Sequence, residues 1–119
     1  DGFKTVNDER GHHEGDQLLR AIAHAINATV RPGDVAARVG GDEFAVLLPA
    51  TSVCEACVIG ERIRTAVADS AVLPVSLSVG VAPLSRDSRI ALLAADTALY
   101  KAKAAGRDCV VAAADLMIP

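Results

Sequence analysis

Apolar residues recur at three- and four-residue spacing between Gln17 and Val30, and this spacing predicts an amphipathic helix. The positions on its apolar face are Leu18, Leu19, Ile22, Ala25, Ile26 and Val30. Asp16 stands where an N-cap belongs, and Pro32-Gly33 predicts the end of the helix. The preceding segment, Thr5–Asp16, is polar and contains two glycines, so it is predicted to be a turn or loop.

Two short apolar runs, Val35–Val39 and Phe44–Leu48, flank the sequence Gly40-Gly41-Asp42-Glu43. Paired glycines between strand-like runs predict a tight hairpin, because Gly accepts the positive φ that such a turn requires. Glycine also leaves the backbone bare, so a ligand can approach it closely. Two carboxylates beside bare backbone fit a Mg²⁺ held against a nucleotide phosphate, although an ordinary acidic hairpin turn has the same composition.

Two further helices are predicted after the hairpin. Ser52 and Glu55 form a capping box that opens a helix reaching to about Ser70. Its inward positions are Ala56, Ile59, Ile63, Ala66 and Val67. The other helix covers Arg89–Ala105 and stops at Gly106, with apolar residues at Leu92, Leu93, Leu99 and Tyr100.

Strict alternation over Val75–Val81 predicts a strand with one buried face. Pro83–Ser88 is predicted to be a loop, Cys109–Ala114 a last strand and Leu116–Pro119 a tail. The predicted order is a strand fragment at the start, then helix, hairpin, helix, strand, helix and strand. This order predicts an α/β (α+β) fold, in which helices pack against a mostly antiparallel sheet.

Composition narrows the possibilities. The 119 residues allow one domain, and 51% are apolar with no Trp, one Tyr and two Phe, so the core must be aliphatic. A net charge of −3 without a basic run argues against binding a nucleic-acid polymer, while a small phosphate-bearing molecule remains possible. No apolar stretch approaches a membrane span, so no membrane contact is expected. Three cysteines suit a reducing cytosol, and the Cys54-x-x-Cys57 pair favours incidental thiols over zinc.

Four blocks of sequence, in order along nearly the whole chain, carry a family pattern. They are Phe3-Lys4-x-x-Asn7-Asp8-x-x-Gly11-His12-x-x-Gly15-Asp16, Arg38-x-Gly40-Gly41-Asp42-Glu43-Phe44, Ser78-Val79-Gly80-Val81-Ala82, and Ala95-Asp96-x-Ala98-Leu99-Tyr100-x-Ala102-Lys103-x-x-Gly106-Arg107. Together they resemble the GGDEF domain of the diguanylate cyclase family. The Gly-Gly-Asp-Glu-Phe sequence alone would be a weak signal, whereas four co-linear blocks are not expected by chance.

The resemblance implies a fold related to nucleotide cyclases and polymerase palms. It implies condensation of two GTP into cyclic di-GMP and two pyrophosphates, by metal-assisted phosphoryl transfer. Two such domains face each other as a homodimer, each holding one GTP and one or two Mg²⁺ or Mn²⁺. It also implies a cytoplasmic location and an upstream sensory or receiver domain that controls pairing.

For the base, the resemblance implies that Asn7 and Asp16 bind the guanine edge. The carboxylate can accept from N1–H and the 2-amino group, and the amide both donates and accepts, so GTP would be preferred over ATP. The alternatives are that Asp16 is a plain helix cap and Asn7 a turn residue. His12 either touches the nucleotide or has a structural role in the loop.

For the metal, the resemblance implies that Asp42 coordinates Mg²⁺ and helps to deprotonate the 3′-hydroxyl. Glu43 belongs to the same signature with a less defined role, and Gly40 and Gly41 let the backbone approach the nucleotide.

For the phosphates, Lys4 would stabilise transition-state charge, and Lys103 and Arg107 would hold the β- and γ-phosphates. The alternative for Lys103 and Arg107 is a solvated helix end, where cations complement the helix dipole.

A second ligand site is implied at Arg31-Pro32-Gly33-Asp34, because the family's product-inhibition site is an Arg-x-x-Asp at this spacing. An Arg can grip phosphate or guanine with two hydrogen bonds, and an Asp can pair with the guanine edge. Arg38 is expected to assist. The alternative is a charged helix end with a Pro-Gly stop.

The chain departs from the family pattern at its front. Asp1 aligns with the second Asp of an Asp-x-Asp-x-Phe-Lys pattern, so the first Asp, a metal ligand, falls before residue 1. Residues 1–119 are therefore expected to be a single partial GGDEF domain, with unpaired sheet edges, weakened Mg²⁺ binding and poor or no activity on its own. The alternative function is a non-catalytic module that binds GTP or cyclic di-GMP.

Overall fold

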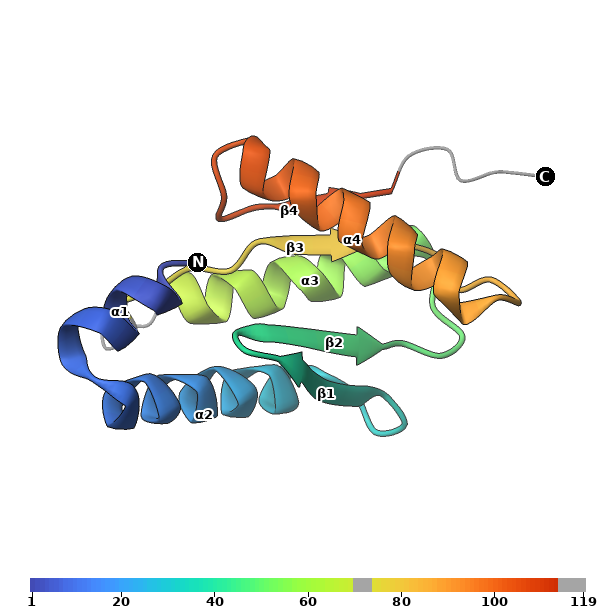
Figure 1. The fold of residues 1–119 in the computed structure, drawn as a ribbon. Coiled ribbons are helices and arrows are strands. Elements are labelled where there is room, and N and C mark those ends of the chain that lie inside the picture. Colours follow the sequence, from blue (N-terminus) through green and yellow to red (C-terminus); the bar gives the residue numbers. More distant parts are fainter. Residues whose placement is uncertain (70–73, 114–119) are drawn as a thin grey trace.

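The computed structural model describes residues 1–69 and 74–113. Its elements follow the chain in an α+β order, as predicted (Figure 1). They are α1 (Phe3–Arg10), α2 (His12–Thr29), β1 (Val35–Gly40), β2 (Glu43–Leu47), α3 (Val53–Ala68), β3 (Val79–Val81), α4 (Ser88–Ala104) and β4 (Val110–Ala112). None of the helices in these ranges is long and apolar enough to cross a membrane.

The prediction of a strand fragment and then a loop over 5–16 was wrong, because two helices meet there. α1 begins at Phe3, and α2 begins at His12, with only Gly11 between them at a φ of 91°. The Gly11 N–H closes α1 on the Asn7 carbonyl oxygen at 3.0 Å. α1 buries little apolar surface of its own, with Val6 as its buried residue, which is why no periodic pattern revealed it.

Asp16 consequently lies inside α2, and the prediction that it is the N-cap was wrong. The N-cap position belongs to Gly11, which makes no side-chain cap bond. The predicted apolar face of α2 is confirmed, with Leu18, Leu19, Ile22 and Ile26 buried. The helix ends at Thr29, just before the predicted stop.

The hairpin is confirmed. β1 pairs antiparallel with β2, from Val35 opposite Leu47 to Gly40 opposite Glu43, with an irregularity between Arg38 and Gly40. The turn itself consists of Gly41, at a φ of 37°, and Asp42.

The capping box of α3 is confirmed by both of its bonds. The Glu55 N–H donates to Ser52 Oγ, and the Ser52 N–H donates to Glu55 Oε1, each at 3.1 Å. Ile59, Ile63 and Val67 are buried as predicted, and Ala56 is half-buried. Ala66 is exposed, contrary to prediction, because the buried positions advance by four residues and leave it beside the stripe. Ser70 lies outside the described residues.

The prediction of one mostly antiparallel sheet was wrong in its detail, because the described strands form two separate pairs. β3 covers only Val79–Val81 of the predicted strand, and β4 covers Val110–Ala112; the two pair in parallel. Parallel strands need a crossover connection, and α4 supplies it. Ala114 and Leu116–Pro119 lie outside the described residues.

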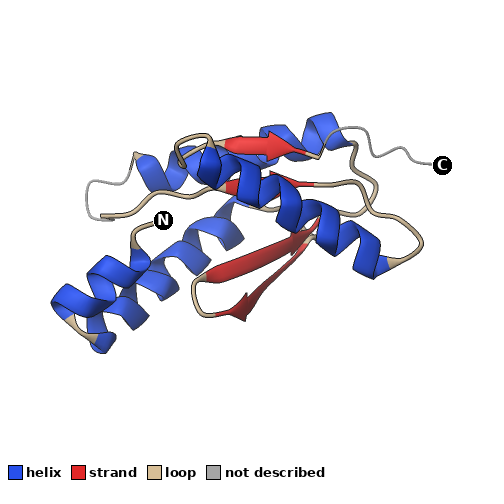
Figure 2. Ribbon diagram, turned by 45° about the horizontal axis from the view of Figure 1, so that its top comes forward, coloured by secondary structure: helices blue, strands red, loops and turns tan. Residues whose placement is uncertain are grey.

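The parallel pair lies between α3 and α4, and two glycines let the helices come close (Figure 2). A Cβ on Gly80 would lie 2.9 Å from Leu99 Cα, and a Cβ on Gly60 would lie 3.4 Å from Val79 Cγ1. The buried face of α4 is therefore made of small residues, Ala91, Ala98 and Ala102. Its large apolar residues Leu92, Leu93 and Tyr100 are exposed, and Leu99 is half-buried.

The main core joins α1, α2, α3 and the hairpin, and it is aliphatic as predicted. Its buried members are Val6, Leu18, Ile22, Ile26, Ile59, Ile63, Val67 and Val75, with Phe3 and Phe44 packed at the edge.

Candidate functional site

The corner between α1 and α2 brings Asn7 and His12 together. Asn7 Nδ2 lies 3.0 Å from His12 Nδ1 across the corner. The Asn7 side chain also lies against Gly15, where a Cβ would be 3.3 Å from Asn7 Cγ. Asp16 follows Gly15 on α2 and is exposed, but consecutive helix residues point in different directions, so a shared site for Asn7 and Asp16 stays a prediction. His12 thus orients Asn7, and its contact with a nucleotide stays a prediction.

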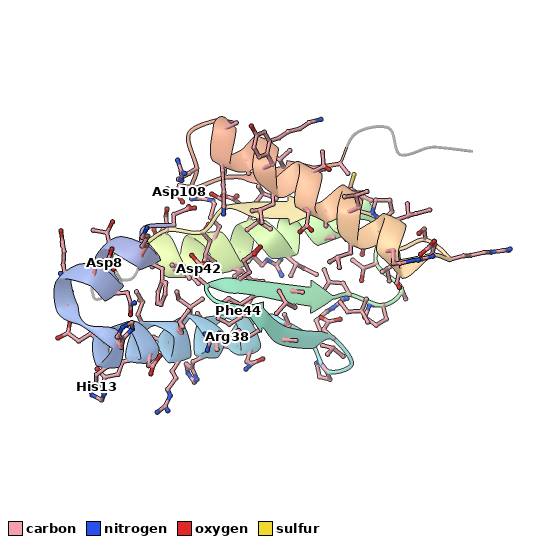
Figure 3. The ribbon with its side chains drawn as sticks, viewed as in Figure 1. Asp8, His13, Arg38, Asp42, Phe44 and Asp108 are labelled. Carbon is pink, nitrogen blue, oxygen red and sulfur yellow. The ribbon has the colours of Figure 1, made fainter. Side chains whose placement is uncertain are left out.

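The hairpin turn presents its two carboxylates to solvent. Gly40, Gly41, Asp42 and Glu43 are all exposed. Arg38 Nε donates to the Gly41 carbonyl oxygen at 2.9 Å and so braces the turn (Figure 3). This bond places Arg38 at the turn, and the structure does not bring it to Arg31, which it was predicted to assist.

The residues predicted to bind phosphate come from both ends of the chain. Lys4 is exposed in the first turn of α1. Lys103 is exposed in the last turn of α4, and Arg107 is exposed in the turn that follows that helix. Arg107 Nε lies 4.0 Å from Asp1 Oδ1, which brings this turn to the segment before α1. Within the described residues, no hydrogen bond or ion pair joins Asp42 to Lys103 or Arg107.

The donor set at the turn fits a magnesium ion that brings its own oxygen ligands. Within residues 1–69 and 74–113, no group of three His, Cys, Asp or Glu side chains could hold a metal ion alone. Mg²⁺ beside a nucleotide commonly takes only one or two protein carboxylates, with water and phosphates completing its shell, and Asp42 and Glu43 match that need. Burial raises the pKa of the Cys57 thiol, which disfavours the thiolate that a zinc site would require.

A groove of about 320 Å³ runs between α2 and the hairpin. It is lined by Asp16, Leu19, Arg20, Ala23, Ile26, Asn27, Ala36, Ala37, Arg38 and Phe44. The volume is within the range of small-ligand sites. Arg20 and Asn27 were not predicted to line a site. They lie four and eleven residues after Asp16, so all three residues share one face of α2. Asn7, Lys103 and Arg107 are not among the lining residues, so the groove covers only part of the predicted site.

The Arg31–Asp34 motif forms a closed pair just before β1, at the end of the hairpin away from its turn. Arg31 Nε and Nη2 donate to the two Asp34 oxygens at 3.1 Å each, and the Arg31 N–H donates to Oδ2 at 2.8 Å. Arg31 Nη2 also donates to Thr51 Oγ1 at 2.6 Å. Hydrogen bonds from the Arg31 side chain and backbone hold the pKa of Asp34 below its usual range. The Arg31 side chain is nevertheless 46% exposed, so it remains accessible.

Comparison with known proteins identifies the family. A sequence model described as "Diguanylate cyclase, GGDEF domain" matches residues 1–109. The uncharacterized protein YhcK of Bacillus subtilis is 46% identical over 120 residues, which cover 92% of this chain and 33% of YhcK. The response regulator PleD of Caulobacter vibrioides is 41% identical over 122 residues, which cover 93% of this chain and 27% of PleD. The chain thus spans about a third or less of the length of these two relatives.

Solved structures agree. The GGDEF domain of DgcB from Caulobacter crescentus, in complex with c-di-GMP, matches with a TM-score of 0.87 at 33% identity, over 95% of this chain and 72% of that one. The active GGEEF domain of a diguanylate cyclase from Vibrio cholerae matches with a TM-score of 0.84 at 31% identity, over 95% and 77%. Both matches confirm the α+β fold class, and with the sequence comparisons they establish that this chain belongs to the GGDEF, or diguanylate cyclase, domain family.

Proposed function

We propose that this chain carries the catalytic residues of a diguanylate cyclase, which condenses two GTP into cyclic di-GMP and two pyrophosphates. The observation that carries the proposal is the hairpin turn, which presents Asp42 and Glu43 to solvent beside the bare backbone of Gly40 and Gly41. Membership of the GGDEF family supports it.

Base recognition falls to the α1–α2 corner. Asn7 is oriented by His12 and by its contact with Gly15, and the exposed Asp16 on α2 offers a carboxylate. Guanine presents N1–H and a 2-amino group to an acceptor, and adenine lacks this donor pair. The corner therefore selects GTP over ATP.

Phosphate chemistry falls to the turn and the end of α4. Asp42, with Glu43 beside it, would hold a Mg²⁺ or Mn²⁺, and that ion would neutralise phosphate charge when bound. Lys103 and Arg107 hold the β- and γ-phosphates, and Lys4 stabilises charge on the α-phosphate. Gly40 and Gly41 leave room for the nucleotide, because neither has a side chain in the way.

Each bond-forming step joins the 3′-oxygen of one GTP to the α-phosphorus of the other. The bond from that phosphorus to the β-phosphate oxygen breaks, pyrophosphate leaves, and the 3′-hydroxyl proton passes to Asp42 or to solvent. Two such steps close the ring. Because each chain offers one site, two chains facing each other are needed, so the active species is a homodimer.

Control by a partner or by an attached domain is part of the proposal. PleD is a response regulator, and the diguanylate cyclase SiaD of Pseudomonas aeruginosa has been solved in complex with its activator SiaC. A sensory or receiver domain upstream of residues 1–119, or a separate activator, would bring two of these chains together.

A second function, binding of cyclic di-GMP at Arg31 and Asp34, is favoured by the geometry of that pair. Arg31 is exposed and held in a fixed orientation by Asp34 and Thr51, so little side-chain freedom is lost on binding. Binding here would inhibit the cyclase by its product, or would be the main activity if the chain does not turn over GTP.

The test is incubation with GTP and Mg²⁺, followed by chromatographic separation of nucleotides, over a range of protein concentrations. An Asp42→Ala variant serves as the control. Cyclic di-GMP that is lost in the control supports the cyclase. No product, combined with cyclic di-GMP binding that Arg31→Ala abolishes, would favour the binding module instead. Binding of neither GTP nor cyclic di-GMP would contradict both functions.

A further inference from the structure

The carboxylate of Asp1 is buried among hydrogen-bond donors, although no role was predicted for it. Its side chain is only 7% exposed. Ser76 Oγ donates to Oδ2 at 2.9 Å, and Ser78 Oγ lies 2.9 Å from both carboxylate oxygens. The backbone N–H of Asp108 donates to Oδ2 at 3.3 Å. One side chain thus ties the segment before β3 to the turn after α4.

That turn has an unusual backbone. Gly106, Arg107 and Asp108 follow one another with φ values of 113°, 65° and 49°. The left-handed region is disfavoured for residues with a Cβ, and such conformations persist only when the surroundings hold them. Asp108 is held by the bond to Asp1 and by Arg64 Nη1, which lies 2.9 Å from Asp108 Oδ1.

The turn decides where the Arg107 side chain leaves the backbone. Its N–H donates to the Ala102 carbonyl oxygen at 3.0 Å, and its Nε lies 4.0 Å from Asp1 Oδ1. The Arg107 side chain is still 60% exposed, so its guanidinium group can reach a ligand while Asp1 restrains its base. Lys103 lies one helical turn earlier on α4 and is also exposed.

We propose that Asp1 is a positioning residue, which holds Arg107 where it can bind the β- and γ-phosphates of the nucleotide. This inference rests on the proposed function, in which Arg107 contacts those phosphates. Asp1 touches neither phosphate nor base, and it acts through the turn at 106–108.

The sign of the expected effect separates positioning from simple charge. Removal of a negative charge near the site would by itself strengthen binding of an anionic triphosphate. Loss of the anchor for Arg107 has the opposite effect. A weaker affinity for GTP in Asp1→Ala would therefore exclude a simple charge effect.

The test measures the affinity of the chain for GTP and for GMP, with Mg²⁺ present, by isothermal titration calorimetry. Asp1→Ala is expected to weaken GTP binding roughly fivefold to tenfold and to leave GMP binding unchanged, because GMP lacks the β- and γ-phosphates. Asp1→Asn, which keeps an acceptor for the Asp108 N–H, is expected to show a smaller loss. The matched control is Asp8→Ala, which removes an exposed carboxylate of α1.

A double variant and hydrogen exchange complete the test. Asp1→Ala combined with Arg107→Ala should bind GTP no more weakly than Arg107→Ala alone, because Asp1 acts only through Arg107. Amide hydrogen exchange at Asp108 should become faster in Asp1→Ala.

Three outcomes would overturn the proposal. Equal weakening of GTP and GMP binding would show that Asp1 supports the fold in general. Unchanged or stronger GTP binding in Asp1→Ala would show that Arg107 needs no anchor. If Arg107→Ala itself leaves GTP binding unchanged, the phosphate contact of the proposed function fails and the positioning role fails with it.

Discussion

Both ends of the β1–β2 hairpin carry charged residues, but these are paired with each other at one end and exposed to solvent at the other. At the loop end, Arg31 and Asp34 satisfy each other through three hydrogen bonds. At the turn end, Asp42 and Glu43 are exposed, and within the described residues no ion pair includes either of them. The loop end is therefore arranged before any ligand arrives, whereas the two carboxylates of the turn are left available for the cation that the proposed function requires.

The largest expected effect is at the turn end. Asp42→Ala should lower cyclic di-GMP formation on the order of 100-fold or more, because the charge that develops on the phosphate loses its metal-binding partner. The thermal midpoint should stay nearly unchanged, since the side chain is exposed. Product chromatography and thermal melts measure the two quantities. Full activity in this variant would contradict the proposed metal site at the turn.

The next effect is at the loop end. Arg31→Ala should weaken binding of cyclic di-GMP about tenfold to hundredfold. The reason is that the ligand loses a guanidinium group that can donate two hydrogen bonds to its phosphate or guanine. Turnover of GTP in the absence of product should be unchanged, since Arg31 lies at the far end of β1 from the turn. Calorimetry with cyclic di-GMP and initial rates with GTP measure these. An equal loss in both assays would mean that the two ends are one site.

A smaller effect is expected at the α1–α2 corner, where base recognition is proposed and phosphate binding is not. Gly15→Ala would place a methyl group in conflict with Asn7 Oδ1 and should displace the Asn7 amide from its contact with His12. We expect the KM for GTP to rise roughly fivefold and the preference for GTP over ATP to fall, with kcat nearly constant. An unchanged preference for GTP over ATP would contradict a role of Asn7 in base recognition.

The smallest effect is a pH dependence confined to the loop end. Arg31 lowers the pKa of Asp34 below its ordinary value of 3.8 in the folded chain. The pair therefore contributes its stability above the ordinary pKa, and this contribution is lost as the pH falls through the lowered value. Thermal melts between pH 6 and pH 2 should show a steeper acid loss than in Asp34→Asn. If the thermal midpoints of the two proteins fall equally with pH, the Arg31–Asp34 pair does not contribute to the acid loss of stability.

Local signals predicted the hairpin and the start of α3 correctly. The Gly-Gly turn and the Ser52–Glu55 box each act over three or four residues, so their outcome depends little on the rest of the chain. The face of α2 was equally clear, because its apolar residues repeat at three- and four-residue spacing along the helix.

Packing decided α1, which was predicted wrongly, and the buried face of α4, which was predicted as a helix over nearly the observed residues. α1 has a single buried residue, Val6, and its helix depends on contact with α2 through Asn7 and Gly15. α4 turns alanines inward, because Gly80 brings its strand so close that larger side chains have no room. Neither fact can be found from periodicity, since both depend on what lies across the contact.

The sequence by itself determined the family, the hairpin and the identity of the candidate site residues, because those depend on residue types at fixed short spacing. Only the tertiary structure separated Arg38 from Arg31 and gave Asp1 its partners at Ser76, Ser78 and Asp108. The physical reason is distance along the chain. Contacts between residues 75 to 107 positions apart exist only when the core has brought their elements together.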